Sequence, residues 1–239
     1  MPSYMGAKSA TGAYQAIIAQ MPPHDTYIET HFGTGAVMRN KPRSRRSIAI
    51  ELDKKTLRDF PPPEYAEVHQ GDCHAFLRSF DFYEAGKTLV YADPPYVPST
   101  RTSKKKYRKD YKEGDHLDLI DVLRTIDADV ILSGYPNELY DRLLGDWRTI
   151  EFQVMTRGGP RTECLWLNFD PGKVQWATFA GANFTDRQRI KRKADRWRAN
   201  YEALPPGERL AILGAILELH QSDPQIEGRI RSDEDWRLF

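Results

Sequence analysis

Residues 88–98 read TLVYADPPYVP and place one carboxylate and one aromatic ring beside two prolines. The apolar stretch before the acid predicts a buried strand. Pro94 and Pro95 cannot continue that strand, because proline lacks an N–H group and fixes its own φ. A stiff loop therefore follows the strand and presents Asp93 and Tyr96. A carboxylate held by a rigid backbone can stabilise developing positive charge, and a ring beside it can stack on a flat ligand.

A glycine-rich loop, HFGTG, follows the first predicted strand. Gly33 and Gly35 permit a tight turn and a close approach of the backbone to a ligand, and free N–H groups at the next helix start favour a polar or acidic ligand group. The second strand ends at Glu51, about 20 residues further on, where an acid can hold ribose hydroxyls. Asp72 and Asp93 follow the third and fourth strands. Each of these glycines and acids could simply form a turn or cap a helix. Because such a residue follows each of the first four strands, the pattern instead predicts a ligand site at the carboxyl edge of the sheet.

Predicted strands and helices alternate up to about residue 170, which is typical of an α/β protein with a parallel sheet and helices on both faces. The last two strands are joined only by TRGGPRT, so we expect them to pair antiparallel. The predicted strands are 26–30, 47–51, 66–69, 88–92, 129–133, 148–154 and 163–169, and the predicted helices are 8–21, 34–40, 72–80, 115–127 and 136–144.

The sequence changes character near residues 170–172, DPG. Beyond them, residues 184–204 predict a helix with one apolar face and a basic remainder, and residues 207–220 predict a second, more apolar helix. We therefore divide the chain into a sheet domain, 1–170, and a basic helical C-terminal extension, 171–239. The apolar face of the first helix is formed by Ile190, Ala194, Trp197, Tyr201 and Leu204.

The net charge of the chain is only +1, but basic residues cluster in two segments. One segment directly follows the Asp93 loop, and the other lies on the first helix of the extension. A single basic block is usually a solvated face, whereas two blocks on a near-neutral chain indicate a polyanion that touches both. We therefore expect nucleic-acid contacts from Arg101, Lys104, Lys105, Lys106, Arg108, Lys109, Arg187, Arg189, Arg192 and Lys193.

Several function classes are disfavoured by what the sequence contains. Cys73 and Cys164 are its only cysteines, which suits a reducing compartment, and we expect a cytoplasmic protein. They cannot supply a cysteine zinc cage, and the H-x-E and P-C-x-x-C motifs of zinc deaminases are absent. Neither cysteine lies in a loop suited to the nucleophile that cytosine C5 methylation needs. No apolar run is long enough to span a membrane, and no signal pattern is present.

Several motifs together resemble those of S-adenosylmethionine-dependent methyltransferases. Residues 93–96, DPPY, are similar to the tetrad of enzymes that methylate exocyclic amines of DNA bases, and residues 32–35, FGTG, to their F-x-G-x-G cofactor loop. Residues 3–9, SYMGAKS, resemble the aromatic-x-G-G-K signature of Dam-like (D12 class) adenine methyltransferases, with Ala7 in place of the second glycine. The resemblance covers residues 3–169, including the segments 111–123, 130–144 and 161–169.

The resemblance implies a Rossmann-like, seven-stranded class I methyltransferase sheet with a reversed last strand and with S-adenosylmethionine as cofactor. It also implies methylation of DNA at adenine N6, because aspartate at the first tetrad position favours that target over cytosine N4, protein glutamine or RNA. A flipped-out base would offer its amine to the Asp93 carboxylate and the Pro94 carbonyl and stack on Tyr96, with Pro95 keeping the loop rigid. The implied cofactor residues are Tyr4, Lys8, Glu29, Phe32, Gly33, Gly35, Glu51, Asp72, Cys73 and Asp93.

Three other functions stay open on the sequence alone. A related enzyme could methylate adenines in RNA, a protein of this fold could bind DNA without catalysis, and the acids at the sheet edge could hold a metal in a nuclease. The intact cofactor residues argue against a mere binding protein, and a nuclease leaves the tetrad unexplained. The nuclease would use Glu51, Asp53, Lys54 and Asp72.

The short distance between Asp72 and the tetrad bears on sequence specificity. Dam-like enzymes usually carry a base-reading module between these two positions. Here only residues 73–92 separate them, and a predicted helix and strand use nearly all of that length. We therefore expect relaxed sequence specificity.

Overall fold

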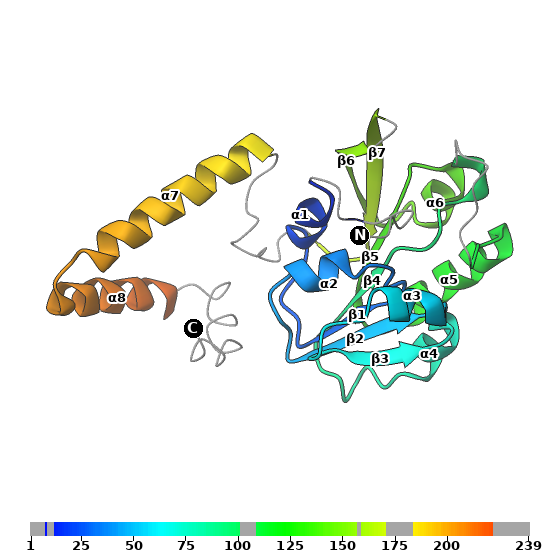
Figure 1. Cartoon of the computed structure of the whole chain (residues 1–239), viewed down its shortest axis with the longest axis horizontal. Helices are drawn as coiled ribbons and strands as arrows, with labels where there is room; N and C mark the ends of the chain where they lie inside the picture. Colours follow the sequence, from blue (N-terminus) through cyan, green and yellow to red (C-terminus); the bar gives the residue numbers. More distant parts are fainter. Residues whose placement is uncertain (1–7, 9–11, 101–108, 157–158, 171–183, 222–239) are drawn as a thin grey trace.

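The computed structural model describes residues 8, 12–100, 109–156, 159–170 and 184–221, and these contain one seven-stranded sheet. The strands lie in the order β3-β2-β1-β4-β5-β7-β6 (Figure 1). Neighbours from β3 to β5 pair in parallel, whereas β7 runs antiparallel to both β5 and β6. The strands are β1 (Thr26–Glu29), β2 (Arg46–Glu51), β3 (Glu67–Gln70), β4 (Thr88–Ala92), β5 (Asp129–Gly134), β6 (Arg148–Thr156) and β7 (Gly159–Leu167).

This strand order, with the reversed β7 between β5 and β6, is the Rossmann-like sheet of the class I methyltransferase fold, as the family resemblance implied. The long β6–β7 pair extends from the Arg148–Leu167 partners to the Thr156–Gly159 partners. Because β1, β2, β3, β4 and β5 are parallel, their carboxyl ends lie at one edge of the sheet. The loops that carry the predicted ligand residues therefore start from the same edge.

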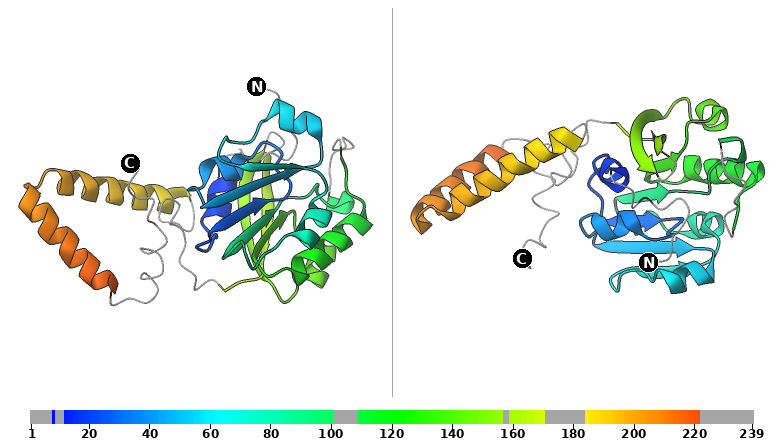
Figure 2. Two further views of the ribbon diagram at one scale, coloured as in Figure 1. Left: turned by 90° about the horizontal axis from the view of Figure 1, so that it is seen from below. Right: turned by 45° about the horizontal axis from the view of Figure 1, so that its top comes forward.

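Helices cover both faces of the sheet, as expected (Figure 2). Helices α4, α5 and α6 pack on one face over a core that includes Leu119 and Val90. Helices α1 and α2 pack on the other face over a core that includes Ile17 and Leu89. The short helices of this domain are α1 (Ala13–Ile18), α2 (Ala36–Asn40), α3 (Lys54–Asp59), α4 (Cys73–Ser79), η1 (Pro98–Thr100) and α6 (Glu138–Leu143), and α5 (Glu113–Thr125) is longer.

The strand that precedes the tetrad is buried along its whole length. Leu89 and Tyr91 enter the core on the α1 side, and Val90 and Ala92 enter the core on the α5 side, because successive side chains of a strand point to opposite faces. Burying one large apolar side chain stabilises a fold by about 1.5–3 kcal/mol. With β1 and β5 on either side, β4 thus fixes the point at which Asp93 leaves the sheet.

Helix α3 was not predicted by the sequence pattern. Asp53 caps its start: one carboxylate oxygen accepts a hydrogen bond from Lys55 N (3.1 Å), and the other accepts one from the Thr56 hydroxyl (2.9 Å). The helix is only six residues long, and Leu57 is its partly buried apolar contact with the core. So short an element shows no apolar period, and only its cap marks it in the sequence.

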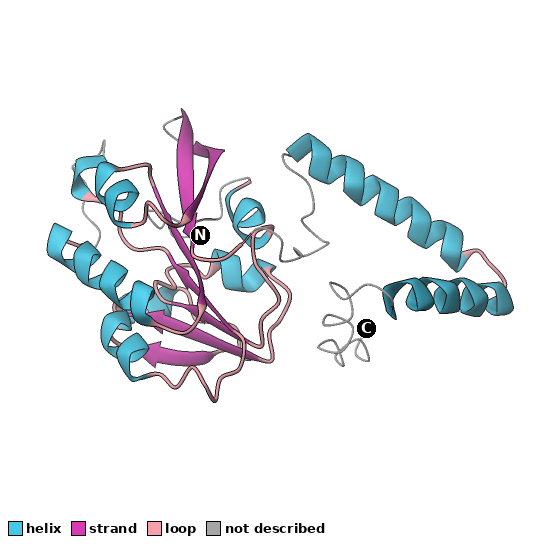
Figure 3. Ribbon diagram, turned by 180° about the vertical axis from the view of Figure 1, so that it is seen from behind, coloured by secondary structure: helices cyan, strands magenta, loops and turns pink. Residues whose placement is uncertain are grey.

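Two long helices, α7 (Phe184–Glu202) and α8 (Pro206–Gln221), form the described part of the extension, close to the predicted bounds (Figure 3). The Tyr201 hydroxyl donates to the Arg209 carbonyl (3.1 Å), and Arg209 Nε donates to the Leu204 carbonyl (2.7 Å), which fixes the turn between them. Trp197 and Leu210 are 66% and 71% exposed, so the apolar faces of both helices remain accessible. Within the described ranges, no helix combines the length and apolar character needed to cross a membrane.

Candidate active site at the carboxyl edge of the sheet

Asp93 leaves the end of β4 with its carboxylate held by side chains from other segments. Its Oδ1 atom accepts a hydrogen bond from the Ser133 hydroxyl on β5 (2.9 Å) and pairs with Lys8 Nζ (2.9 Å). Ser133 is in turn hydrogen-bonded to the Tyr91 hydroxyl (3.0 Å). The Asp93 side chain is only 16% exposed. The predicted catalytic carboxylate is therefore largely shielded from solvent and fixed in position, as electrostatic preorganisation requires.

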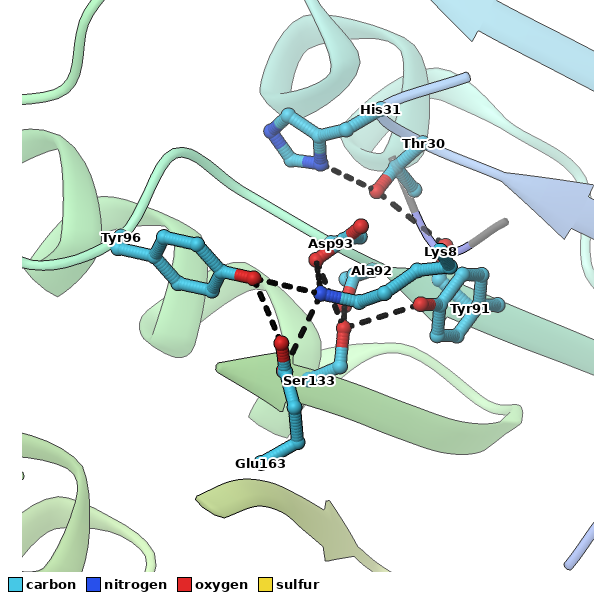
Figure 4. A network of polar contacts seen from close by, with 9 residues as sticks. All are labelled: Lys8, Thr30, His31, Tyr91, Ala92, Asp93, Tyr96, Ser133 and Glu163. Atoms are coloured by element: carbon cyan, nitrogen blue, oxygen red, sulfur yellow. Dashed lines mark hydrogen bonds and ion pairs between the residues drawn. The ribbon is translucent and has the colours of Figure 1, made fainter. Parts of the chain in front are cut away.

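The Lys8 ammonium joins Asp93 to a second carboxylate, that of Glu163 on β7 (Figure 4). Lys8 Nζ lies 3.2 Å from Glu163 Oε2 and donates to the Tyr96 hydroxyl at 3.1 Å. The Tyr96 hydroxyl donates to Glu163 Oε1 at 2.7 Å. Lys8 and Glu163 are both buried. We call these four residues, Lys8, Asp93, Tyr96 and Glu163, the Asp93 cluster.

The ring of Tyr96 stacks on the ring of Tyr135, which directly follows β5. The two centroids are 4.0 Å apart, and the ring planes differ by 15°. The guanidinium of Arg161 lies 5.8 Å from the centroid of the Tyr135 ring. Offset aromatic stacking of this kind restricts the orientation of both rings. The tetrad aromatic is thus held in one plane beside Asp93.

Burial and charge oppose each other within the Asp93 cluster. Burial raises the pKa of Asp93 above its usual range, and the Lys8 ammonium counteracts part of that rise. Burial lowers the pKa of Lys8, because it disfavours the charged form. The attraction of the nearby Asp93 and Glu163 carboxylates is stronger than this effect and holds the pKa of Lys8 well above its usual value. Burial also raises the pKa of Tyr96, which keeps its hydroxyl a hydrogen-bond donor. One ammonium is therefore shared between two acidic side chains.

The glycine loop is attached to β2 through Glu51. Gly33 N donates to Glu51 Oε2 and Asp53 N donates to Oε1, both at 2.9 Å. Gly33 and Gly35 have φ values of 53° and 64°, in the left-handed region that favours glycine. A Cβ atom at Gly35 would lie 2.1 Å from Cζ of Phe32, so the Phe32 ring uses the space that the missing side chain leaves. Both predicted glycines are thus required by the backbone of this loop.

The donor and acceptor groups at this edge fit S-adenosylmethionine. A carboxylate offers about four acceptor positions. Each oxygen of Glu51 accepts one hydrogen bond from a backbone N–H group, and these bonds orient the carboxylate. The remaining acceptor positions can bind a pair of ribose hydroxyls. Burial raises the pKa of Glu51, although the same N–H groups favour its charged form. The residues present therefore match the nucleoside part of this cofactor.

Two other predicted cofactor residues make contacts within the fold. Glu29 is buried at the end of β1, and its Oε2 atom accepts hydrogen bonds from the Tyr27 hydroxyl and from Met38 N, both at 3.0 Å. Burial raises the pKa of Glu29 to about 8. Asp72 caps α4, where its Oδ1 atom accepts from Ala75 N at 2.9 Å. Any role of these two acids toward a cofactor stays a prediction.

Cys73 lies beside a connected set of polar rings. Its Sγ atom is 3.7 Å from His31 Nε2 and 3.6 Å from the Tyr111 hydroxyl. That hydroxyl is also hydrogen-bonded to His31 Nε2 (2.8 Å) and to His74 Nε2 (2.9 Å). Burial raises the pKa of Cys73 to about 12 and lowers the pKa of His31 to about 3. A thiol with so high a pKa is a poor nucleophile. Any contact of Cys73 with a cofactor stays a prediction.

Part of the predicted interface lies outside the described residues. Tyr4 of the cofactor set does so, and so do five basic residues, Arg101, Lys104, Lys105, Lys106 and Arg108. Lys109 is described and exposed. On α7, Arg189 pairs with Asp186 at 2.7 Å, and Arg192 and Lys193 are exposed. Contact of either basic segment with nucleic acid remains a prediction.

In the part of the chain that the structure describes, no group of three or more histidine, cysteine, aspartate or glutamate side chains is placed to share a metal ion. Glu51 binds the glycine loop, and Asp53 and Asp72 cap helices. The acids considered for a nuclease therefore each make contacts within the fold.

Sequence reasoning did not assign a role to Ser133, Tyr135 or Glu163. All three fall in segments that resemble the Dam-like class, but no local pattern distinguishes them. Glu163 did carry one signal, because a charged residue within the apolar run ECLWL is unusual for a buried strand. Such residues are rarely buried unless they are paired, and Glu163 is paired with Lys8.

No family model matches this sequence. No curated protein matches it either. Among solved structures, the N-methyltransferase NodS from Bradyrhizobium japonicum WM9 is 10% identical over 66% of this chain and 93% of that chain, with a TM-score of 0.43. The 23S rRNA methyltransferase ErmE is 15% identical over 74% of this chain and 80% of that chain, with a TM-score of 0.40. A dimethyladenosine transferase from Plasmodium falciparum is 15% identical over 65% of this chain and 60% of that chain, with a TM-score of 0.39.

Proposed function

We propose that this protein is an S-adenosylmethionine-dependent methyltransferase that methylates the N6 amine of adenine in DNA. The observation that carries the proposal is the partly buried carboxylate of Asp93, fixed by Ser133 at the end of β4. It lies on the same edge of the sheet as the loop that Glu51 holds. The similarity of residues 3–169 to the Dam-like class supports adenine in DNA as the target.

Bound S-adenosylmethionine supplies an activated methyl group. The amine of adenine is a poor nucleophile, because its lone pair is delocalised into the ring. Asp93 and the carbonyl of Pro94 accept hydrogen bonds from the amine and so favour the geometry in which the lone pair can attack. Positive charge would develop on the nitrogen as it takes the methyl group from the sulfonium, and the Asp93 carboxylate beside it would stabilise that charge. The nitrogen then releases one proton to water, and the neutral methylated base leaves.

The rigidity of the tetrad matters for this chemistry. Pro94 and Pro95 restrict the backbone, and the Tyr96 ring is held by Tyr135 and Glu163. Acceptors that need no rearrangement during the reaction are the main source of electrostatic catalysis. A base within a duplex cannot bring its amine to such a loop, so the target must be flipped out or single-stranded.

The proposal is tested with purified protein, radiolabelled S-adenosylmethionine, and unmethylated DNA or RNA of mixed sequence. We expect label in DNA, recovered as N6-methyladenine after digestion to nucleosides and mass spectrometry. Label in RNA alone would identify an RNA adenine methyltransferase instead. Calorimetric titration with S-adenosylhomocysteine distinguishes a methyltransferase from a non-catalytic DNA-binding protein. The non-catalytic protein would bind DNA but would not bind S-adenosylhomocysteine.

A further inference from the structure

The Lys8 ammonium already occupies part of the carboxylate that the target amine needs, at the Oδ1 atom that also accepts from Ser133. Its Nζ atom lies 2.9 Å from Asp93 Oδ1, at hydrogen-bonding distance for an N–H donor. The ammonium therefore makes the contact that the N6 amine of a flipped base would make. As long as Lys8 stays there, an incoming amine competes with a full positive charge for the same carboxylate.

Glu163 offers the ammonium a second position within the same cluster. Its Oε2 atom is 3.2 Å from Lys8 Nζ, and its Oε1 atom accepts the hydrogen bond from Tyr96. Glu163 is 4% exposed and Lys8 is 5% exposed, so water cannot readily replace either partner. A buried ammonium that left Asp93 without another carboxylate would be severely destabilised. With Glu163 present, Lys8 can give up Asp93 and remain paired.

We propose that Lys8 substitutes for the target amine in the free protein and transfers to Glu163 when that amine reaches Asp93. This inference rests on the proposed function and assigns Glu163 as a positioning residue that acts through Lys8 and Tyr96. In the free protein, Lys8 keeps Asp93 charged and aligned. During base entry, Glu163 takes the ammonium, so that the Asp93 carboxylate becomes available to the amine without leaving a buried charge unpaired.

Methyl-transfer rates of four variants test the role of Glu163. They are Glu163→Gln, Lys8→Met, the double variant, and Glu151→Gln as a control that changes an exposed acid on the neighbouring strand β6. Among the described residues, Glu163→Gln leaves Lys8 with Asp93 as its one carboxylate partner. We therefore expect kcat to fall about tenfold or more, as for loss of one charge-assisted hydrogen bond, while affinity for S-adenosylhomocysteine and the rate of Glu151→Gln stay near wild type.

The double variant decides between positioning and simple structural support. Without Lys8, no ammonium from that side chain competes with the amine for Asp93, so adding Lys8→Met to Glu163→Gln should recover part of the lost rate. The comparison is made over a pH range, at values where Asp93 is ionised in every variant. If Glu163 only supports the fold, the second substitution lowers the rate further, and that result would overturn the proposal.

A measurement without turnover follows Lys8 directly. Nitrogen-15 NMR of labelled lysine reports the ammonium of Lys8, identified by its loss in Lys8→Met. S-adenosylhomocysteine is added with an oligonucleotide that contains adenine, or with the same oligonucleotide containing purine, which lacks the exocyclic amine. We expect the Lys8 signal to shift with adenine and to stay with purine. An equal response of the Lys8 signal to the adenine and purine oligonucleotides would overturn the inference, even if the wild type methylates DNA. The proposed function itself would be rejected by a different result, in which the protein neither transfers methyl groups nor binds S-adenosylhomocysteine.

Discussion

Single residues set the chemistry, and Asp93 has the most demanding position. Its carboxylate is partly buried, hydrogen-bonded to Ser133 and paired with Lys8. Asp93→Ala should lower kcat by about 10²–10³, because it removes a preorganised acceptor from the developing charge on nitrogen. Steady-state kinetics measures this loss, and the cooperative thermal transition should persist. Near-normal turnover in this variant would show that the tetrad does not hold the amine.

The pH dependence of methyl transfer should move in opposite directions in two variants. The reaction requires Asp93 as a carboxylate, so the rate falls as pH falls through the pKa of Asp93. Burial raises this pKa, Lys8 lowers it, and Glu163 raises it. Lys8→Met should therefore move the acid limb to higher pH, and Glu163→Gln should move it to lower pH. Measuring the rate of each variant as a function of pH checks the direction of both shifts. If the acid limbs of both variants coincide with that of the wild type, a group other than Asp93 controls the pH profile.

The sequence placed Asp93 and Tyr96 close together, because one short motif contains both, and both contact Lys8 in the structure. It did not predict the partners of these residues. Lys8 and Glu163 are 155 positions apart in the chain, and Tyr96 and Glu163 are 67 apart. Only the folded sheet brings β7 next to β5 and so places Glu163 beside the tetrad. Contacts of this kind leave no periodic or spacing signal in one sequence.

At the scale of elements, the glycine loop depends on one acid at the end of β2. Glu51→Ala removes both the bond to Gly33 and the acceptors for the ribose hydroxyls. Charge-assisted hydrogen bonds contribute about 1.5–3 kcal/mol each, so the Kd for S-adenosylhomocysteine should rise at least about tenfold. Calorimetry measures the change, with Glu64→Ala as a control at an exposed acid. An unchanged Kd would transfer the ribose role to another acid at this edge.

The strands were easier to predict than the short helices. Strand β4 is a continuous apolar run between turn signals, and its predicted and observed bounds coincide. Helix α3 has six residues and a single partly buried apolar contact, Leu57, so it produces no apolar period. The antiparallel pairing of β6 with β7 was predictable, because a short connection cannot return a strand in parallel. The insertion of β7 beside β5 was expected only through the family resemblance.

For the whole molecule, the distribution of charge should govern affinity for DNA. Arg189, Arg192 and Lys193 lie three and four positions apart and share one side of α7. Arg189 is partly neutralised by Asp186, so Arg192 and Lys193 should contribute more. Replacing all three by glutamine should flatten the dependence of log K on log salt by about 0.9 for each lost phosphate contact. Binding titrations at several salt concentrations measure the slope.

A suitable control for that experiment neutralises Arg124, which lies on α5 and pairs with Asp146 at 2.7 Å. This residue belongs to neither basic block, so its replacement by glutamine should leave the salt slope unchanged. If the triple variant of α7 keeps the wild-type slope as well, the helical extension does not contact DNA phosphates, and the other basic segment carries the affinity.

The last prediction concerns how the protein selects its sites. Between Asp72 and Asp93, α4 occupies residues 73–79 and β4 occupies residues 88–92, so a short connection is all that remains. Direct readout needs several side chains in a groove, and each good base contact supplies about 1–3 kcal/mol of discrimination. The two basic segments that remain, 97–114 and 184–204, are rich in lysine and arginine, which favour phosphates. Their residues of the types that usually read adenine are Gln188 and Asn200.

We therefore expect adenine to be modified in a very short sequence context or in almost any context. Selection of adenine would come from the surroundings of Asp93 and Tyr96, and affinity from contacts with phosphates. Because such contacts carry no sequence information, raising the salt concentration should weaken methylation at all sites alike. Single-molecule sequencing of a treated plasmid measures this, with the Asp93→Ala protein as a background control. Modification confined to one palindrome of about four or more bases would instead show that a basic segment reads the bases directly, since phosphate contacts alone cannot generate that selectivity.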